Sequence, residues 1–159
     1  MFTKISKVLK LRVRACLILL IFIITNVHAA AVENSHVIFD KIFHDWTDGF
    51  NQKDIVVSCG LFSKNVVANY QGTPQKNYET ICNGFKEIFG EKNRDYHYRY
   101  QLKNVYYTDN LAAARITWYL TIYEYGKVIS EVQDEGIDIL EKNNAGKWQI
   151  INYIAFPEK

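Results

Sequence analysis

Residues 136–153 constrain the fold more than any other stretch, because they read as two strands joined by a tight turn. Ile137 and Ile139 alternate with their neighbours in the two-residue period of a strand. Residues 143–146, Asn-Asn-Ala-Gly, tolerate positive φ and so favour a reversal of the chain. Asp138 lies between the two isoleucines. The hairpin therefore carries a carboxylate inside an otherwise apolar strand.

The first 29 residues have the pattern of a secretory signal peptide. Cations without any acid precede an apolar run at residues 15–24, and Val27 and Ala29 supply a small-residue cleavage pattern. The cations are Lys4, Lys7, Lys10, Arg12 and Arg14. The run of about ten residues is shorter than the roughly 20 that span a bilayer. We expect cleavage after residue 29, export to the periplasm or the medium, and no membrane association of the mature chain.

The basic charge of the chain belongs to this leader. Of 19 Lys and Arg residues, the five in the leader are removed, which leaves 14 against 17 Asp and Glu. Because the mature chain is mildly acidic and binding of nucleic acid depends on a basic surface, we do not expect it to bind nucleic acid. The remaining length of about 130 residues suits one domain, so we expect a single domain at residues 30–159.

Cys59 and Cys82 are the two cysteines that follow the leader. An oxidising compartment permits a disulfide between them. Two separately buried thiols are the alternative, because a free cysteine packs as a small apolar residue. We expect the disulfide, and the sequence offers no histidine placed to activate a catalytic thiol.

The remaining pattern predicts helices first and hairpin-linked strands last. We expect helices at residues 34–50, 54–61 and 77–89, and strands at residues 65–70, from 94 to the turn at 108–110, 111–124, 128–142 and 147–156. An apolar stripe that begins at Phe39 marks the first helix, Asp54 caps the second, and Asn77 begins the third. In the strand that begins at residue 94, tyrosines alternate with charged residues, and the alternation leaves open which face is inward. This order is typical of an α+β domain with helices on one face of an antiparallel sheet.

The order of elements, with residues 46–62 and 138–148 as its most specific stretches, resembles the SnoaL-like group of the nuclear transport factor 2-like superfamily. That superfamily includes ketosteroid isomerase, and the resemblance covers essentially the whole mature chain. It implies N-terminal helices packed on a curved, mostly antiparallel sheet that forms a cone with an apolar pocket. It also implies chemistry without a cofactor and, since many members pair through the sheet, a homodimer.

The resemblance carries over only one of three catalytic positions. Ketosteroid isomerase uses an Asp base, with a Tyr and a protonated Asp that stabilise the oxyanion. The protonated Asp matches Asp138, whereas the helix Tyr matches Trp46 and the base matches Tyr70. Indole is a donor without useful acidity, and a phenol is a poor base near neutral pH. The isomerase mechanism is therefore not expected.

Asp138 is the leading site residue. We interpret it as a pocket acid whose pKa is raised by an apolar site. Alternatives are a carboxylate satisfied by Tyr70, Trp46 or a backbone amide, or an exposed position after a one-residue register slip. Asp134 has the same strand parity and is the second acid of interest, although such a run is ordinarily an exposed strand end. Tyr70 and Trp46 are expected to line the pocket, and packing in the core is the alternative role for each, more so for Trp46.

No metal site is predicted. His36, Asp40 and His44 have helical spacing but sweep across the polar side of a helix, and no fourth ligand accompanies them.

We therefore expect an exported small-molecule-binding or accessory domain, whose largely apolar ligand lies in a pocket between the sheet and the first helix and meets Trp46, Tyr70, Asp134 and Asp138. The first alternative is a cofactor-independent isomerase, dehydratase or cyclase, with Asp138 as acid or base and Tyr70 as hydrogen-bond donor. The second alternative is a protein-interaction module whose cone is filled by side chains.

Overall fold

The computed structural model describes residues 36–158, and the compact unit discussed below spans Ile38–Lys159. The expected signal peptide, residues 1–29, lies outside the described residues. The helices are an N-terminal helix (residues 36–51), α2 (Ile55–Gly60) and α3 (Tyr78–Gly90). The strands are β1 (Phe62–Tyr70), β2 (Arg94–Tyr107), β3 (Leu111–Glu124), β4 (Lys127–Lys142) and β5 (Trp148–Pro157). Nowhere between residues 36 and 158 is a helix both long and apolar enough to cross a bilayer.

The N-terminal helix is held by one apolar stripe. Phe39, Phe43, Trp46 and Phe50 recur at spacings of three and four residues and are each at most 6% exposed. The opposite side meets water and carries an i, i+4 ion pair between Lys41 and Asp45. The helix therefore buries one face against the sheet and solvates the other.

Polar caps fix where the two shorter helices begin. The Asp54 carboxylate accepts hydrogen bonds from the backbone N–H groups of Val56 and Val57 at the start of α2. Asn77 accepts from the backbone N–H of Thr80 at the start of α3. Both caps were expected from the sequence, and they set where α2 and α3 begin.

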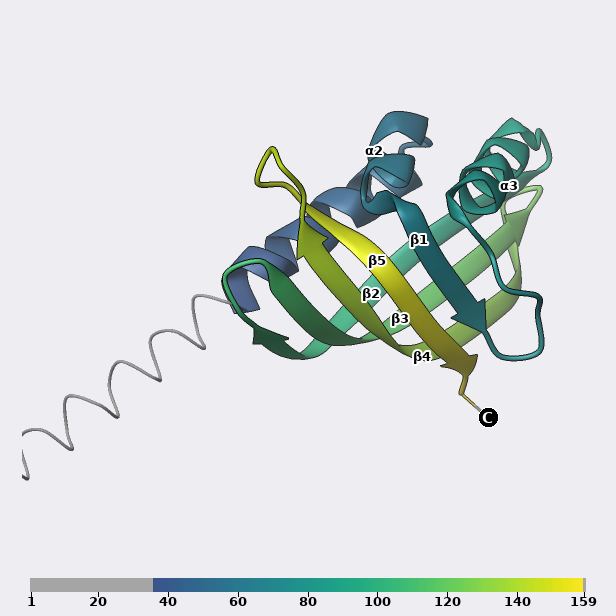
Figure 1. Cartoon of the computed structure of the whole chain (residues 1–159). Helices are drawn as coiled ribbons and strands as arrows, with labels where there is room; N and C mark the ends of the chain where they lie inside the picture. The colour runs from purple at the N-terminus through teal and green to yellow at the C-terminus, as the bar shows by residue number, and fades with distance from the viewer. Residues whose placement is uncertain (1–35, 159) are drawn as a thin grey trace, which may run out of the picture. The chain divides into compact units, whose positions relative to one another are not determined.

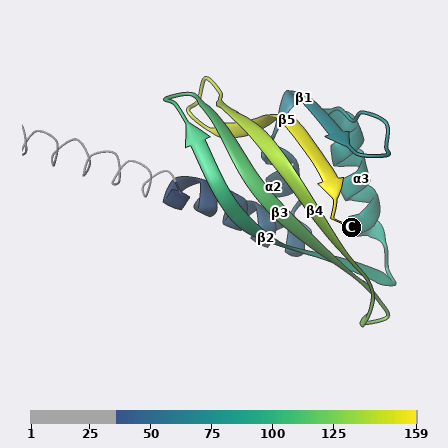
Figure 2. The same cartoon turned by 90° about the horizontal axis from the view of Figure 1, so that it is seen from below.

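The five strands form one sheet in the order β1-β5-β4-β3-β2. The pairs β2–β3, β3–β4 and β4–β5 are antiparallel, and β1 joins β5 in parallel. Figures 1 and 2 show the long strands curving across the molecule, with the helices gathered on one side of the sheet. The predicted α+β architecture, with helices on a curved and mostly antiparallel sheet, is confirmed.

The tyrosine face of β2 is the inward one. Tyr96, Tyr98 and Tyr100 pack against the buried core, whereas His97 and Arg99 are exposed. The alternation in the sequence left the inward face of this strand open. The rings face inward because their burial is favourable, and the charged side chains face water.

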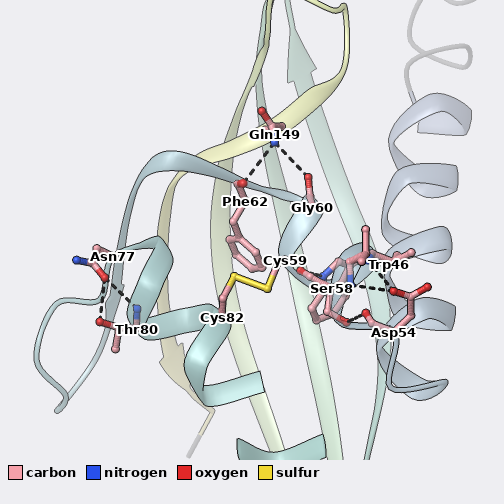
Figure 3. The surroundings of a disulfide bond; sticks show 12 residues. Trp46, Asp54, Ser58, Cys59, Gly60, Phe62, Asn77, Thr80, Cys82 and Gln149 are labelled. Atoms are coloured by element: carbon pink, nitrogen blue, oxygen red, sulfur yellow. Dashed lines mark hydrogen bonds between the residues drawn. A yellow bond between two sulfur atoms is a disulfide. The ribbon is translucent and has the colours of Figure 1, made fainter. Parts of the chain in front are cut away.

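The disulfide joins two helices that are separated by β1 in the chain. Cys59 of α2 and Cys82 of α3 are bonded, with their Cα atoms 5.6 Å apart. Figure 3 shows the bond lying between the two helices, beside the ring of Phe62. The sulfur atoms therefore fasten α2 to α3.

Candidate ligand-binding site

A cavity of about 460 Å³ opens between the sheet and α3. Its apolar and aromatic walls include Trp46, Leu61, Phe62, Ile81, Phe85, Ile88, Trp118, Leu120, Val132 and Ile150. We expected the pocket to lie between the sheet and the first helix. Instead, α3 supplies the facing wall, and Trp46 is the one lining residue from the N-terminal helix within the described chain. The exposed residues Thr73, Lys76 and Thr80 line its open side.

Two acids reach this cavity from one face of β4. Asp134 and Asp138 lie four residues apart on the strand, are 8% and 1% exposed, and both line the cavity. Gly136 lies between them, and a Cβ there would meet the backbone oxygen of Ile154 at 2.9 Å. A side chain at position 136 therefore cannot be added without moving β5.

Asp138 accepts and donates no hydrogen bond among residues 36–158. Both of its carboxyl oxygens are buried and unpaired within the described part of the chain, so neither Tyr70 nor Trp46 satisfies it. Burial raises the pKa of Asp138 to about 7, because a low-dielectric site disfavours the charged form. The nearby Trp118 indole opposes this shift in pKa, without reaching the geometry of a hydrogen bond. Near neutral pH the group is therefore divided between acid and carboxylate.

Tyr70 is paired with the other acid. Its O–H donates to a carboxylate oxygen of Asp134 at 2.6 Å. Burial, reinforced by this bond, raises the pKa of Tyr70 to about 12. Burial also raises the pKa of Asp134, and the hydrogen bond from Tyr70 partly offsets that rise. The sequence placed both residues at the pocket but did not indicate that they bond to each other.

Two further tyrosines complete the polar end of the cavity, in addition to the four residues that were predicted to line it. Tyr98 of β2 and Tyr153 of β5 both line it, and Tyr153 is the cross-strand partner of Asp138. Burial raises the pKa of each phenol, and the charges of the nearby acids add to the rise. Both hydroxyls therefore remain protonated at physiological pH.

Trp46 contributes its ring to the cavity rather than its N–H. The indole Nε1 donates to the backbone oxygen of Ser58 at 2.9 Å, which Figure 3 shows. The ring stacks edge-on against Trp118, with centroids 5.0 Å apart. Its polar atom is already satisfied within the fold, so its role toward a ligand is apolar contact.

The polar groups of the cavity do not form a metal site. Among residues 36–158, no three His, Cys, Asp or Glu side chains lie close enough together to hold an ion. The arrangement suits hydrogen bonding and proton transfer by Asp138 and the Tyr70–Asp134 pair.

No protein-family model matches the chain, and no curated protein matches it in sequence. Solved structures do resemble it. A ketosteroid isomerase-like protein from Erwinia carotovora atroseptica is 18% identical, with a TM-score of 0.60 over 76% of this chain and 93% of its own. An NTF2-like protein of unknown function from Pseudomonas putida is 15% identical, with a TM-score of 0.62 over 78% and 87%.

A third similar structure is that of a complex. It is a protein from Catenulispora acidiphila in complex with S-DNPA, 11% identical, with a TM-score of 0.62 over 80% of this chain and 94% of its own. At such identities the likeness to all three is one of fold.

Proposed function

We propose, from the NTF2-like and ketosteroid isomerase-like fold of this chain, that it binds one small, largely apolar molecule. An acceptor atom of that molecule lies against Asp138. The ligand fills the aromatic cavity beneath α3, and its oxygen accepts a hydrogen bond from the protonated carboxyl group.

The observation that carries this proposal is the unpaired Asp138 carboxyl on the cavity wall. A buried polar group without a partner costs roughly 1–3 kcal/mol, so a ligand that supplies the missing partner recovers that free energy on binding. A protonated carboxyl offers one O–H donor. A carbonyl or ether oxygen on an apolar skeleton has the complementary chemistry.

The open volume supports a ligand over the filled cone that we considered as an alternative. A cavity of about 460 Å³ lies within the range of small-molecule sites, which is roughly 300–1,000 Å³. The similarly folded protein from Catenulispora acidiphila was solved in complex with S-DNPA. A protein-interaction module that binds its partner only through the outer face of the sheet does not require an open cavity.

A matched pair of probes tests the acceptor. We expect 2-acetylnaphthalene to bind more tightly than 2-ethylnaphthalene at pH 5.5, by about five-fold or more, because only the ketone accepts a hydrogen bond. The ketone should lose this advantage as the pH rises through about 7, where Asp138 ionises and loses its donor. Quenching of tryptophan fluorescence reports binding, since Trp46 and Trp118 line the cavity.

Asp138→Leu provides the control. The variant should bind both probes equally at every pH, whereas Asp109→Asn, which removes an exposed acid in the β2–β3 turn, should behave as the wild type. Equal affinity of the wild type for the two probes at pH 5.5 would contradict the proposal.

A second candidate is a cofactor-independent enzyme that moves a proton, and the Tyr70–Asp134 pair favours it. In acid–base enzymes, two carboxyl groups in one site often lie in different surroundings, so that one donates a proton while the other accepts one. Asp134 as a carboxylate could take a proton from a carbon beside a carbonyl, while Asp138 donates to the carbonyl oxygen and an enol forms. In a ketone with a neighbouring carbon–carbon double bond, Asp134 would return the proton to the far carbon of the resulting dienol. The enol O–H would give its proton back to Asp138 as the carbonyl re-forms, which completes an isomerisation and restores both acids. The phenol of Tyr70 would orient Asp134 rather than touch the substrate.

The same ketone tests this chemistry. If the pair is catalytic, the methyl protons of 2-acetylnaphthalene should exchange with D₂O faster in the presence of the protein, as followed by proton NMR. Asp134→Asn should abolish the acceleration while leaving the affinity for the ketone within about two-fold. If the methyl protons exchange no faster than in buffer, the catalytic proposal is wrong, and the proposal of ligand binding is unaffected.

The location that we propose is outside the cytoplasm. The leader pattern and the Cys59–Cys82 disulfide support it, because such bonds persist in oxidising compartments. Fractionation of the native cells, with antibody detection of a chain that begins near residue 30, is the test. Detection of the intact precursor in the cytoplasm alone would contradict it.

A further inference from the structure

A second hollow lies outside the ligand cavity, among α2, α3, the start of β1 and the β4–β5 turn. Its volume is about 550 Å³. We call it the lysine groove, after Lys64, Lys86 and Lys147, which line it. Figure 3 shows the Cys59–Cys82 bond and Phe62 in this region.

The three lysines come from different elements and face no acid. Lys64 lies on β1, Lys86 on α3 and Lys147 in the β4–β5 turn, and no Asp or Glu lines the groove. None of the three forms an ion pair in the part of the chain that the structure describes. Positive charge is therefore gathered without compensation on a mature chain that is otherwise acidic, and an anion there would relieve the repulsion.

Contacts within the fold position these ammonium groups. Lys64 Nζ lies 3.5 Å above the ring of Tyr78, a cation–π contact. The turn that carries Lys147 is fixed by Asn143, whose side-chain oxygen accepts from the backbone N–H of Lys147. The ammonium of Lys147 lies over Gly60, 3.2 Å from where a Cβ at that residue would be. The ammonium groups of Lys64 and Lys147 are thus directed before any ligand arrives.

Apart from the lysines and Gln149, the side chains that line the groove are mainly apolar. Ile55, Val56 and Phe62 contribute hydrocarbon to the lining, and Val56 is 76% exposed. The disulfide holds α2 and α3 together on either side. A ligand that pairs with the lysines and also covers the apolar side chains needs an anionic head group and an apolar tail.

We propose that the lysine groove is a second binding site, which takes a single-chain amphiphile with a phosphate or carboxylate head group. The head lies among the three lysines, and the tail covers Ile55 and Val56. Such a molecule could arrive as a free monomer or from a lipid surface, and the volume of the groove suits the monomer.

Titration calorimetry with decyl phosphate, below its micelle concentration, tests the site. We expect the triple variant Lys64→Gln/Lys86→Gln/Lys147→Gln to lower the affinity about ten-fold or more, because exposed ion pairs are weak singly and three are removed together. The wild type should bind 1-decanol and inorganic phosphate at least about ten-fold more weakly than decyl phosphate, since each offers half of the required chemistry.

The matched control is Lys41→Gln/Lys92→Gln/Lys127→Gln, which changes the net charge equally at exposed positions outside the groove. It should bind as the wild type does. None of the groove lysines lines the ligand cavity, so binding that survives in the groove variant would place the probe elsewhere and overturn the proposal. Binding to phosphatidylglycerol vesicles without binding to monomeric decyl phosphate would also overturn it, as would equal affinity for inorganic phosphate.

Discussion

The protonation of Asp138 predicts a specific dependence of stability on pH. Its carboxyl has an ordinary pKa of 3.8 and a folded-state pKa of about 7, raised by burial. Between these values the folded chain holds a proton that the unfolded chain has released, so a rise in pH favours unfolding. At 1.36 kcal/mol per pH unit, the whole shift in pKa corresponds to about 4 kcal/mol. Of this change in the free energy of unfolding, about 2–3 kcal/mol falls between pH 5 and 8, where it can be measured.

Asp138→Asn removes this titration and nothing else that ionises. We expect the free energy of unfolding of the wild type to fall by about 2–3 kcal/mol more than that of the variant between pH 5 and 8. Urea unfolding of the mature chain, with the disulfide intact and tryptophan fluorescence as the signal, measures both curves. The buried amide of the variant can lower its free energy of unfolding by a constant amount at every pH. This does not affect the comparison, which uses only the change in free energy of unfolding with pH.

Asp138→Leu strengthens the test, because it removes both the charge and the unpaired oxygens. At pH 8 it should be more stable than the wild type, whose carboxylate is then ionised in an apolar site. Parallel pH profiles for the wild type and both variants would refute the reasoning, since they would mean that the folded carboxyl ionises as it does in the unfolded chain.

Three other changes test the surroundings of the site, each by urea unfolding. Tyr70→Phe removes the donor to Asp134 and should cost about 1–3 kcal/mol at pH 8, because a buried carboxylate loses its partner. Gly136→Ala should cost about 1–3 kcal/mol, because its Cβ would lie 2.9 Å from a backbone oxygen of β5. Replacing Cys59 and Cys82 together by Ser should cost about 2–4 kcal/mol, because the bond closes a loop of 23 residues.

Matched substitutions check these predictions. Tyr125→Phe alters a tyrosine that is 75% exposed and should change the stability by less than about 0.5 kcal/mol. Gly84→Ala meets no atom within 4 Å and lies inside α3, so it should stabilise by about 0.5–1 kcal/mol. A loss of stability at residue 84 equal to that at residue 136 would contradict the steric account. An unchanged stability after the cysteine replacement would contradict the role given to the disulfide.

The sequence predicted those parts of the fold that depend on local chemistry. The stripe beginning at Phe39, the caps Asp54 and Asn77, and the final hairpin follow from periodicity and hydrogen bonding within a few residues. The shared parity of two acids on β4 also followed, because side chains at even spacing on a strand share a face.

What the sequence could not predict depends on contacts between distant elements. Counting the hairpin from its Lys142–Trp148 pair would place Asn152 opposite Asp138. A register shift between Ile139 and Leu140 places Tyr153 there instead, and so brings that phenol into the cavity. Such a bulge leaves no clear mark in the sequence.

The parallel pairing of β1 with β5 is likewise tertiary. It sets Tyr70 beside Ala155, which also pairs with Gly136 of β4, and so brings the phenol near the acids. Turn signals report neighbours in the chain, and β1 and β5 are separated by three strands and a helix. The hydrogen bond between Tyr70 and Asp134 therefore could not be predicted from the sequence pattern.

The state of the Asp138 carboxyl, measured directly, is the strongest test of the account. Carbon-13 NMR of protein labelled at aspartate side-chain carboxyls, assigned with Asp138→Asn, can follow this group from pH 4 to 9. We predict titration near pH 7 in the free protein, moving to higher pH when 2-acetylnaphthalene is bound, because the ketone stabilises the protonated form. A carboxyl already ionised at pH 5, with a titration unaffected by the ketone, would contradict the proposal that this acid holds a ligand.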